Sequence, residues 1–248
     1  LGIAISEAIE AVVKSEGKAK YALGSVLGHV LLHQTINGNE AILQMEQAGD
    51  YPDIIVGCTG GGSNLSGLMF PFLGQQLRGG QKIDIIGCEP LSCPSFTKGK
   101  YAYDHGDMAR MTPLIKMHTL GSDFLPPANH SGGLRYHGMS YHLSHLYDLG
   151  LMRAKAYGQK ECFEAGVIFG KQEGIIPAPE GNHAVKGAID AALECKEKGE
   201  SKTILFNLCG HGHFDMTAYD DYFSGKLADD FYDEDSANQS LSKLPEIA

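Results

Sequence analysis

The sequence predicts an α/β protein with a mainly parallel sheet flanked by helices. Apolar, β-branched segments predict buried strands at residues 53–58, 83–90 and 202–212. Strands that are apolar on both faces are typical of parallel sheets, because helices cover both sides of such sheets. Helical periodicity between these segments completes the alternation of strand and helix that indicates an α/β fold.

Four segments predict helices. Apolar residues recur at helical spacing from Ile5 to Val13, and a second candidate covers residues 38–48. The other two candidates are residues 63–76 and the amphipathic segment 182–198. We expect these helices to supply the layers on the two faces of the sheet.

Polar residues at two of these helix starts predict N-caps. Ser63 or Asn64 would cap the third helix, which Pro71 would kink. Asn182 would cap the fourth helix.

Two segments lack clear periodicity. Residues 91–150 are rich in His, Gly, Pro and Tyr, which predicts a long excursion of loops where sites are often built. The segment from Asp229 onward is acidic and polar, and we expect it to fray.

Composition excludes several classes of protein. The chain of 248 residues carries a formal net charge of −10, which disfavours nucleic acid and anionic membrane surfaces as partners. There is no apolar run of about 18 residues and no signal-peptide pattern, so we expect a soluble protein that does not enter a membrane. Six cysteines without a C-x-x-C pair predict reduced, mostly buried thiols in a cytoplasmic protein.

A glycine-rich stretch, IIVGCTGGGSNLSG, joins the first predicted strand to a predicted helix. Because Gly60 to Gly62 lack Cβ atoms, backbone N–H groups there can converge on an oxyanion. The helix N-terminus adds unpaired donors and about half a positive charge. The stretch therefore predicts an anion site that needs no Lys or Arg.

Two nucleotide-binding motifs do not fit this stretch. G-x-x-x-x-G-K-[ST] fails because Ser63 follows Gly62, and G-x-G-x-x-G fails because residue 65 is Leu. A single phosphate is therefore the favoured ligand. A tight strand-to-helix turn without a ligand is the alternative.

Two more stretches carry candidate site residues. Ligands of parallel sheets bind beyond the carboxyl ends of the strands, so NLCGHGHFD (207–215) would bring Cys209 beside the glycines. In EGIIPAPEGNHAV (173–185), Glu180 follows a Pro-rich turn. A buried structural cysteine and a solvated or capping glutamate are the alternatives. His211 and His213 are a weak metal signal without a third ligand.

Five stretches, in this order, resemble the β subunit of tryptophan synthase, a pyridoxal-phosphate enzyme of fold type II. They are GCTGGGSN, GCEP, GGLRYHGMSYHLSHL, EGIIPAPEGNHA and NLCGHGHFDM. The resemblance runs from residue 1 to about residue 225. LLHQTINGNEA and GGLRYHG are similar to the second, divergent β type, which often works without the usual α partner.

The resemblance implies roles for individual residues. Glu180 matches a carboxylate beside the cofactor ring, and Cys209 matches the residue that faces the pyridine nitrogen, usually Ser in this family. Arg135 stands where the usual β subunit has an Asp near the substrate hydroxyl, which leaves open whether serine or O-phosphoserine is the substrate. The residues matched to cofactor binding are Gly60, Gly61, Gly62, Ser63, Asn64, Glu180, Cys209 and Gly210. The residues whose carbonyls match a monovalent-cation site are Gly60, Tyr136 and Gly138.

The implied reaction is a pyridoxal-phosphate-dependent β-replacement in which L-serine and indole give L-tryptophan. The implied assembly is a homodimer, with a tryptophan synthase α subunit as a possible partner. A serine or threonine dehydratase of the same fold and a non-catalytic phosphate-binding module are the alternatives.

One family motif is absent. The Schiff-base lysine of the family sits in H-K-x-N, and none of the eleven histidines here is followed by Lys. We therefore expect a fragment of a longer chain, in preference to half of a split enzyme or a natural truncation, and no turnover by this chain alone. The expected parts are 1–50, the end of an N-terminal domain; 51–225, a cofactor-binding α/β domain; and 226–248, a polar acidic tail.

Overall fold

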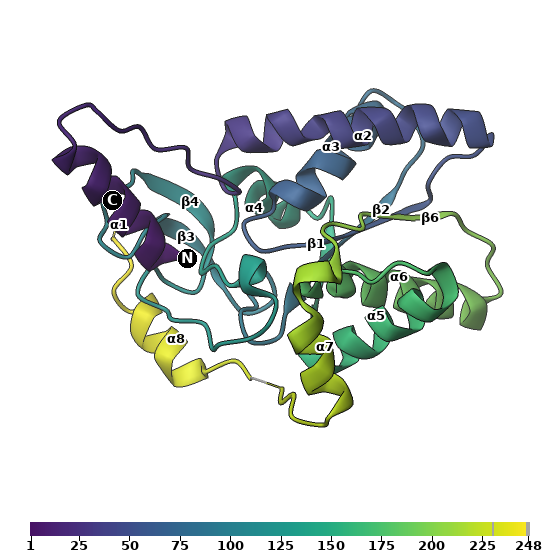
Figure 1. Ribbon diagram of the computed structural model, residues 1–248. Coiled ribbons are helices and arrows are strands. Elements are labelled where there is room, and N and C mark those ends of the chain that lie inside the picture. The colour runs from purple at the N-terminus through teal and green to yellow at the C-terminus, as the bar shows by residue number, and fades with distance from the viewer. Residues whose placement is uncertain (230, 247–248) are drawn as a thin grey trace.

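The computed structural model describes residues 1–229 and 231–246 and contains a four-stranded sheet with the order β5–β2–β1–β6. All three pairings in this sheet are parallel, which confirms the predicted fold class (Figure 1). The strands are β1 (Ile54–Cys58), β2 (Asp84–Pro90), β5 (Arg153–Tyr157) and β6 (Ile204–Phe206). The third predicted strand is thus much shorter than residues 202–212.

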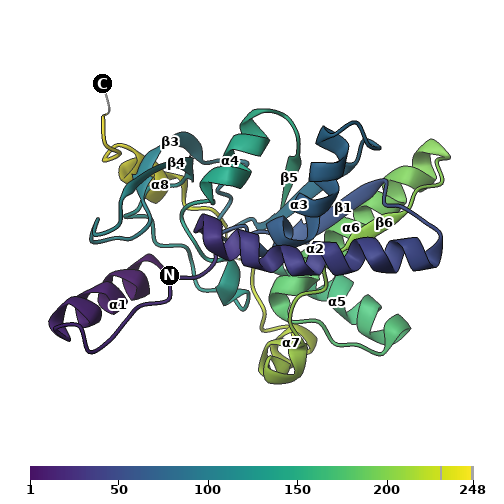
Figure 2. The ribbon, with the colours of Figure 1, turned by 90° about the horizontal axis from the view of Figure 1, so that it is seen from above.

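Helices cover both faces of the sheet. Figures 1 and 2 show α2 (Gly28–Ala48) and α3 (Ser63–Leu77) on one side, and α5 (Gln159–Glu173) and α6 (Pro179–Lys198) on the other. Successive residues of β1 point to opposite faces, so Ile55 packs in the α3 layer and Val56 in the α6 layer. Burial on both faces explains the unbroken apolar character of this strand.

The second helix begins ten residues before the predicted start at residue 38. Gly38 lies inside this helix, where α2 crosses α3. A Cβ atom there would be 2.4 Å from the Leu68 carbonyl oxygen. On the facing helix, a Cβ at Gly67 would be 2.6 Å from the Gln34 carbonyl oxygen. The two glycines therefore permit contact between the helix backbones.

Both predicted N-caps are wrong. Gly62, not Ser63 or Asn64, is the N-cap of α3, and no side chain accepts a capping bond there among the described residues. Helix α6 begins at Pro179, a residue preorganised for the first helical position, so Asn182 lies inside the helix and is buried. Pro71 lies within α3.

Regular structure extends into the predicted loop excursion. Strands β3 (Lys100–His105) and β4 (Leu114–Thr119) form an antiparallel pair, and α4 (Tyr141–Asp148) follows. Buried Asp104 accepts a hydrogen bond from Thr119 Oγ1 at 2.6 Å, which ties the two strands together. The prediction of loops throughout residues 91–150 is therefore wrong.

Three further helices lie outside the central layers. The first predicted helix is confirmed as α1 (Gly2–Lys14), and α7 (Met216–Phe223) follows β6. Helix α8 (Glu234–Leu241) buries Ala237 beside Leu120 and Phe124, so the expectation of a frayed tail is wrong for this segment. Residues 230 and 247–248 of the expected tail lie outside the described residues. No described helix has the length and apolar character needed to cross a bilayer.

A buried carboxyl group holds the turn after β2. Glu89 accepts hydrogen bonds from the backbone N–H groups of Phe96 and Thr97, each at 2.9 Å, and from Thr97 Oγ1 at 2.7 Å. Burial raises the pKa of Glu89 to about 7, and these bonds offset part of that rise. The turn therefore depends on an ionisable group with no solvent contact.

The glycine contact between α2 and α3 predicts opposite effects for two alanine substitutions in α3. Gly67→Ala should lower the free energy of unfolding by about 1–3 kcal/mol, because its Cβ would collide with the backbone of α2. Gly74→Ala should raise it by about 0.5–1 kcal/mol, because only ordinary contacts with the Arg78 side chain surround that position. Urea denaturation measures both, and equal effects would contradict the close helix contact.

The buried carboxyl of Glu89 predicts a stability that falls as the pH rises. Its pKa in the folded state lies above the ordinary value of 4.5. The contribution of the protonated carboxyl to the free energy of unfolding is therefore fully present below pH 4.5 and is lost as the pH rises through about 7. The loss should be about 3 kcal/mol. Glu89→Gln should flatten this dependence in urea titrations between these limits. The exposed variant Glu173→Gln should keep it, and equal slopes in all three proteins would refute the assignment.

Candidate functional site

The carboxyl ends of β1 and β6 bring two predicted stretches together. Cys58 Sγ, at the end of β1, lies 3.3 Å from Cys209 Sγ, which follows β6. Asn207 Nδ2 donates to the Asn64 carbonyl oxygen at 3.2 Å. The prediction that the glycine stretch and the Cys209 stretch share one edge of the sheet is confirmed.

The three glycines form a cradle that side chains would fill. A Cβ at Gly60 would lie 2.6 Å from the Gly133 carbonyl oxygen, and one at Gly61 would lie 2.5 Å from Ser25 Oγ. Gly62 has a φ of +100°, a conformation that residues with a Cβ rarely adopt. Each glycine is therefore required by its surroundings, which is more than a simple turn needs.

The cradle presents unpaired backbone donors. Within the described residues, the N–H groups from Gly60 to Leu65 donate to no protein acceptor. The first turn of α3 supplies several of these groups, together with the positive end of the helix dipole. Thr59 Oγ1, just before the cradle, is buried and also lacks a partner. These neutral donors surround a backbone that carries no side chains, and the arrangement fits the phosphate of pyridoxal phosphate.

Glu180 closes one side of the cradle. It lies in the first turn of α6, and its Oε1 accepts a hydrogen bond from the Gly133 N–H at 2.9 Å. Gly133 belongs to a 3₁₀ turn, Gly132–Leu134, whose backbone also contacts Gly60. Gly133 and Ser25 were not predicted, because only the fold brings them beside the cradle.

The start of α6 also holds the Cys209 stretch. Gly212 N–H donates to the Ile176 carbonyl at 2.8 Å, and a Cβ at Gly210, where φ is +69°, would lie 2.8 Å from Ala178 Cβ. Tyr219 of α7 secures this turn: its hydroxyl donates to the Pro177 carbonyl at 2.6 Å and accepts from Asn182 Nδ2 at 3.1 Å. Tyr219 was not predicted, because only the fold brings α7 to this turn.

The two thiols at the edge of the sheet differ in environment. A hydrogen bond from Cys58 lowers the pKa of half-buried Cys209, whereas the same bond, together with complete burial, raises the pKa of Cys58. The other cysteines are buried, so the expectation of mostly buried, unbridged thiols is confirmed.

The residues matched to substrate and cation lie on the segment after the 3₁₀ turn. Arg135 Nη2 donates to the Pro126 carbonyl at 2.8 Å, while its buried Nε has no partner among the described residues. The Tyr136 carbonyl accepts a bond from Cys93 Sγ at 3.2 Å, and Gly138 pairs with Thr119 in an isolated bridge. No contact tests the cation role of Gly60, Tyr136 and Gly138, which stays a prediction.

A small apolar cavity of about 100 Å³ adjoins the cradle. Val26 and Met139 line it, and they also flank Gly61 and Gly62 respectively. Leu23 and the buried ring of Tyr136 line it further. No local sequence pattern predicts this cavity, because its walls come from three segments far apart in the chain.

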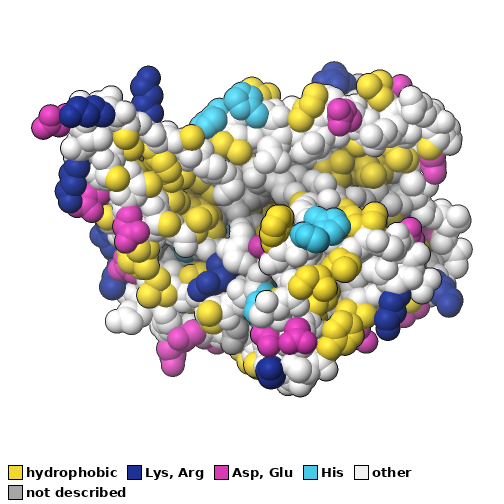
Figure 3. All heavy atoms as spheres, viewed as in Figure 1, with side chains coloured by type: hydrophobic (Ala, Val, Ile, Leu, Met, Phe, Trp, Pro, Cys, Tyr) yellow, Lys and Arg dark blue, Asp and Glu magenta, His cyan; other side chains and the backbone are white. Residues whose placement is uncertain are grey.

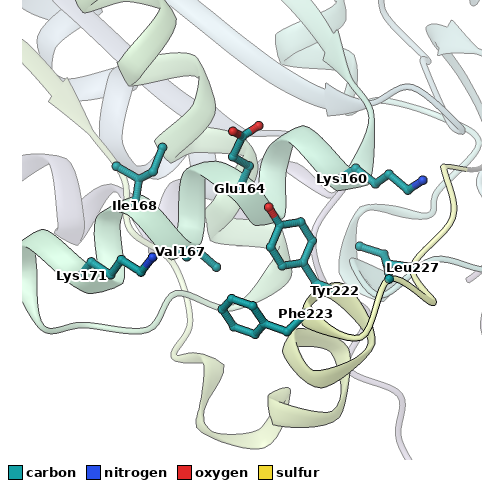
Figure 4. A pocket seen from close by; sticks show the side chains of 9 residues that line it. Lys160, Glu164, Val167, Ile168, Lys171, Tyr222, Phe223 and Leu227 are labelled. Atoms are coloured by element: carbon teal, nitrogen blue, oxygen red, sulfur yellow. The ribbon is translucent and has the colours of Figure 1, made fainter.

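Two open grooves also lie on the surface. One, of about 460 Å³, runs between α2 and β6 and is lined in part by Gln34, Asn64 and Cys209; hydrophobic side chains gather below α2 on this face (Figure 3). The other, of about 580 Å³, lies between α5 and α7 (Figure 4). It is lined by Lys160, Glu164, Val167, Ile168, Lys171, Tyr222, Phe223, Gly225 and Leu227. None of the predicted site residues lines this second groove.

Comparisons with known proteins agree with this geometry. Residues 11–210 match the family model described as "Pyridoxal-phosphate dependent enzyme". A solved structure, a fungal L-serine ammonia-lyase from Rhizomucor miehei, is similar with a TM-score of 0.59 at 15% identity, and the match covers 87% of this chain and 64% of that one. At this identity the similarity concerns the fold alone.

Curated relatives are closer in sequence. The chain is 59% identical over 232 residues to "Tryptophan synthase beta chain 2" of Aquifex aeolicus, and 58% identical over 227 residues to that of Methanosarcina mazei. Each match covers 92% of this chain, and 53% and 51% of the respective relative. The "Tryptophan synthase beta chain" of Pyrococcus horikoshii is 53% identical over 99% of this chain and 52% of its own. The resemblance is confirmed, and the chain spans about half the length of these relatives.

The hydroxyl of Tyr219 predicts a specific loss of stability. Tyr219→Phe should lower the free energy of unfolding by about 1–3 kcal/mol, because the buried Pro177 carbonyl and Asn182 amide lose their partner. Tyr222→Phe, in the same helix, should have little effect, since its hydroxyl makes no hydrogen bond within the described residues. Urea denaturation compares the two, and an equal loss would contradict the role assigned to Tyr219.

Proposed function

The chain belongs to the pyridoxal-phosphate dependent enzyme family, and we propose that it forms the phosphate-binding part of a tryptophan synthase β-type enzyme. The proposed reaction replaces the hydroxyl group of L-serine with indole to give L-tryptophan. The observation that carries this proposal is the position of a small apolar cavity directly beside the glycine cradle and its neutral backbone donors.

The cradle residues would hold the cofactor by its phosphate. The N–H groups of Gly60, Gly61, Gly62, Ser63 and Asn64 would donate to the phosphate oxygens. Glu180 and Cys209, which lie on two sides of the cradle, would orient the ring, with Gly210 permitting the turn beside Cys209. Bound pyridoxal phosphate supplies an electron sink for chemistry at the α-carbon of an amino acid.

The apolar cavity would receive the second substrate. Its walls present Leu23, Val26, Tyr136 and Met139, which suit a flat aromatic molecule such as indole. An apolar site also excludes water, which would otherwise compete with indole for the activated serine. Arg135, whose Nε has no partner in the described part of the chain, would orient a polar or anionic group of serine or O-phosphoserine.

The finer parts of the proposal follow the similarity to the relatives. The carbonyls of Gly60, Tyr136 and Gly138 would bind a monovalent cation. The working assembly would be a cytoplasmic homodimer, able to receive an α subunit. Since no His-Lys sequence occurs in the 248 residues, turnover would require the cofactor-anchoring lysine from another polypeptide segment.

A phosphate-specific binding test examines the cradle. The chain should bind pyridoxal phosphate, followed by its fluorescence, at least about 10-fold more tightly than pyridoxal, because the cradle supplies donors only to the phosphate. Gly61→Ala should remove this preference, since its Cβ would collide with Ser25. Gly132→Ala, where a Cβ meets open space, is the matched control. Equal binding of both ligands by the unsubstituted chain would exclude the cradle as a phosphate site.

A chimera tests the reaction. The chain is joined to the first half of the Aquifex aeolicus relative, and tryptophan is measured with L-serine and indole. Tryptophan as the main product supports the proposal. Pyruvate as the main product in the presence of indole would instead favour the dehydratase alternative. The 248-residue chain alone should give neither product.

A further inference from the structure

Cys58 and Cys209 are positioned to react with each other. Cys58 is the last residue of β1, Cys209 follows the adjacent parallel strand β6, and their sulfur atoms are 3.3 Å apart. A disulfide bond is about 2.05 Å long, so the two sulfur atoms must approach by about 1.2 Å to form one.

Cys209 differs in access from the remaining cysteines. Cys209 is only half-buried and lines the open groove between α2 and β6. Cys88 and Cys93 are buried and do not line this groove. A reagent in the groove therefore meets Cys209 first, in a position where Cys58 is the neighbouring thiol.

We propose that Cys58 and Cys209 form a reversible disulfide, a redox-modification site at the edge of the cradle, with a small-molecule disulfide as the oxidant. The Cys209 thiolate attacks the oxidant and releases one small thiol, leaving a mixed disulfide on Cys209. Cys58 then attacks Cys209 Sγ and releases the second small thiol. The two protons lost by the cysteines reside on the two released thiols, so the oxidant is reduced as the pair is oxidised.

Closing this bond would alter the cofactor site. It removes the S–H group of Cys209 and draws the Cys209 stretch toward β1, while the Cys209 carbonyl lies against Gly181 of α6. This consequence rests on the proposed function, in which Cys209 faces the cofactor ring. Oxidation should then weaken binding of pyridoxal phosphate by at least about 10-fold, and a dithiol reductant should restore it.

Mass spectrometry after treatment with glutathione disulfide tests the bond without any cofactor. The chain should become lighter by two hydrogen atoms, and its digest should contain Cys58 linked to Cys209. Cys58→Ala should instead retain one glutathione on Cys209, because no resolving thiol remains. Cys195→Ala, which changes a buried cysteine outside the pair, should behave like the unsubstituted chain.

Three results would overturn the inference: glutathione that persists on Cys209 of the unsubstituted chain, a bond between other cysteines, or no oxidation at all. The two proposals fail separately. Absence of the Cys58–Cys209 bond leaves binding of pyridoxal phosphate by the reduced chain intact. Absence of cofactor binding leaves the disulfide measurement unaffected.

Discussion

Strand β1 pairs in parallel with β2 on one side and with β6 on the other, and this pairing determines what meets at the candidate site. Because all three strands run in the same direction, the segments that follow them emerge at one edge of the sheet. The glycine cradle and the Cys209 stretch are neighbours for this reason, although Cys58 and Cys209 are 151 residues apart in the sequence. Glu180 and Gly133 pack beside the cradle at the same edge.

The electrostatic character of the site follows from its backbone. An anion site made of N–H groups and a helix terminus contains no Lys or Arg side chain that must be desolvated or ordered. Such a site suits a chain with a net charge of −10, because it concentrates positive potential locally. The adjoining walls can then be apolar, as Val26 and Met139 are.

The sequence predicted the parts of the fold that depend on local pattern. Hydrophobic periodicity predicts the apolar strands and helix α1. The rule that ligands bind beyond the carboxyl ends of parallel strands predicts that Gly60–Gly62 and Cys209 lie together. The early start of α2 was missed; Gly38 lies inside this helix, where α3 packs against it. Tyr219 and the apolar cavity depend on contacts between distant segments, which no local pattern encodes. The roles of Arg135, Tyr136 and Gly138 came from family resemblance, not from their own neighbours.

The crossing of α2 and α3 has a consequence for binding thermodynamics. Gly67 lies about one turn from Ser63, so the backbone contact with Gln34 fixes α3 close to the end that forms the cradle. The donors of that end are thus ordered when the chain folds, before any anion arrives. The conformational entropy of this segment is therefore lost during folding and not during binding. Less of the interaction energy with the ligand is then offset, so the affinity is higher.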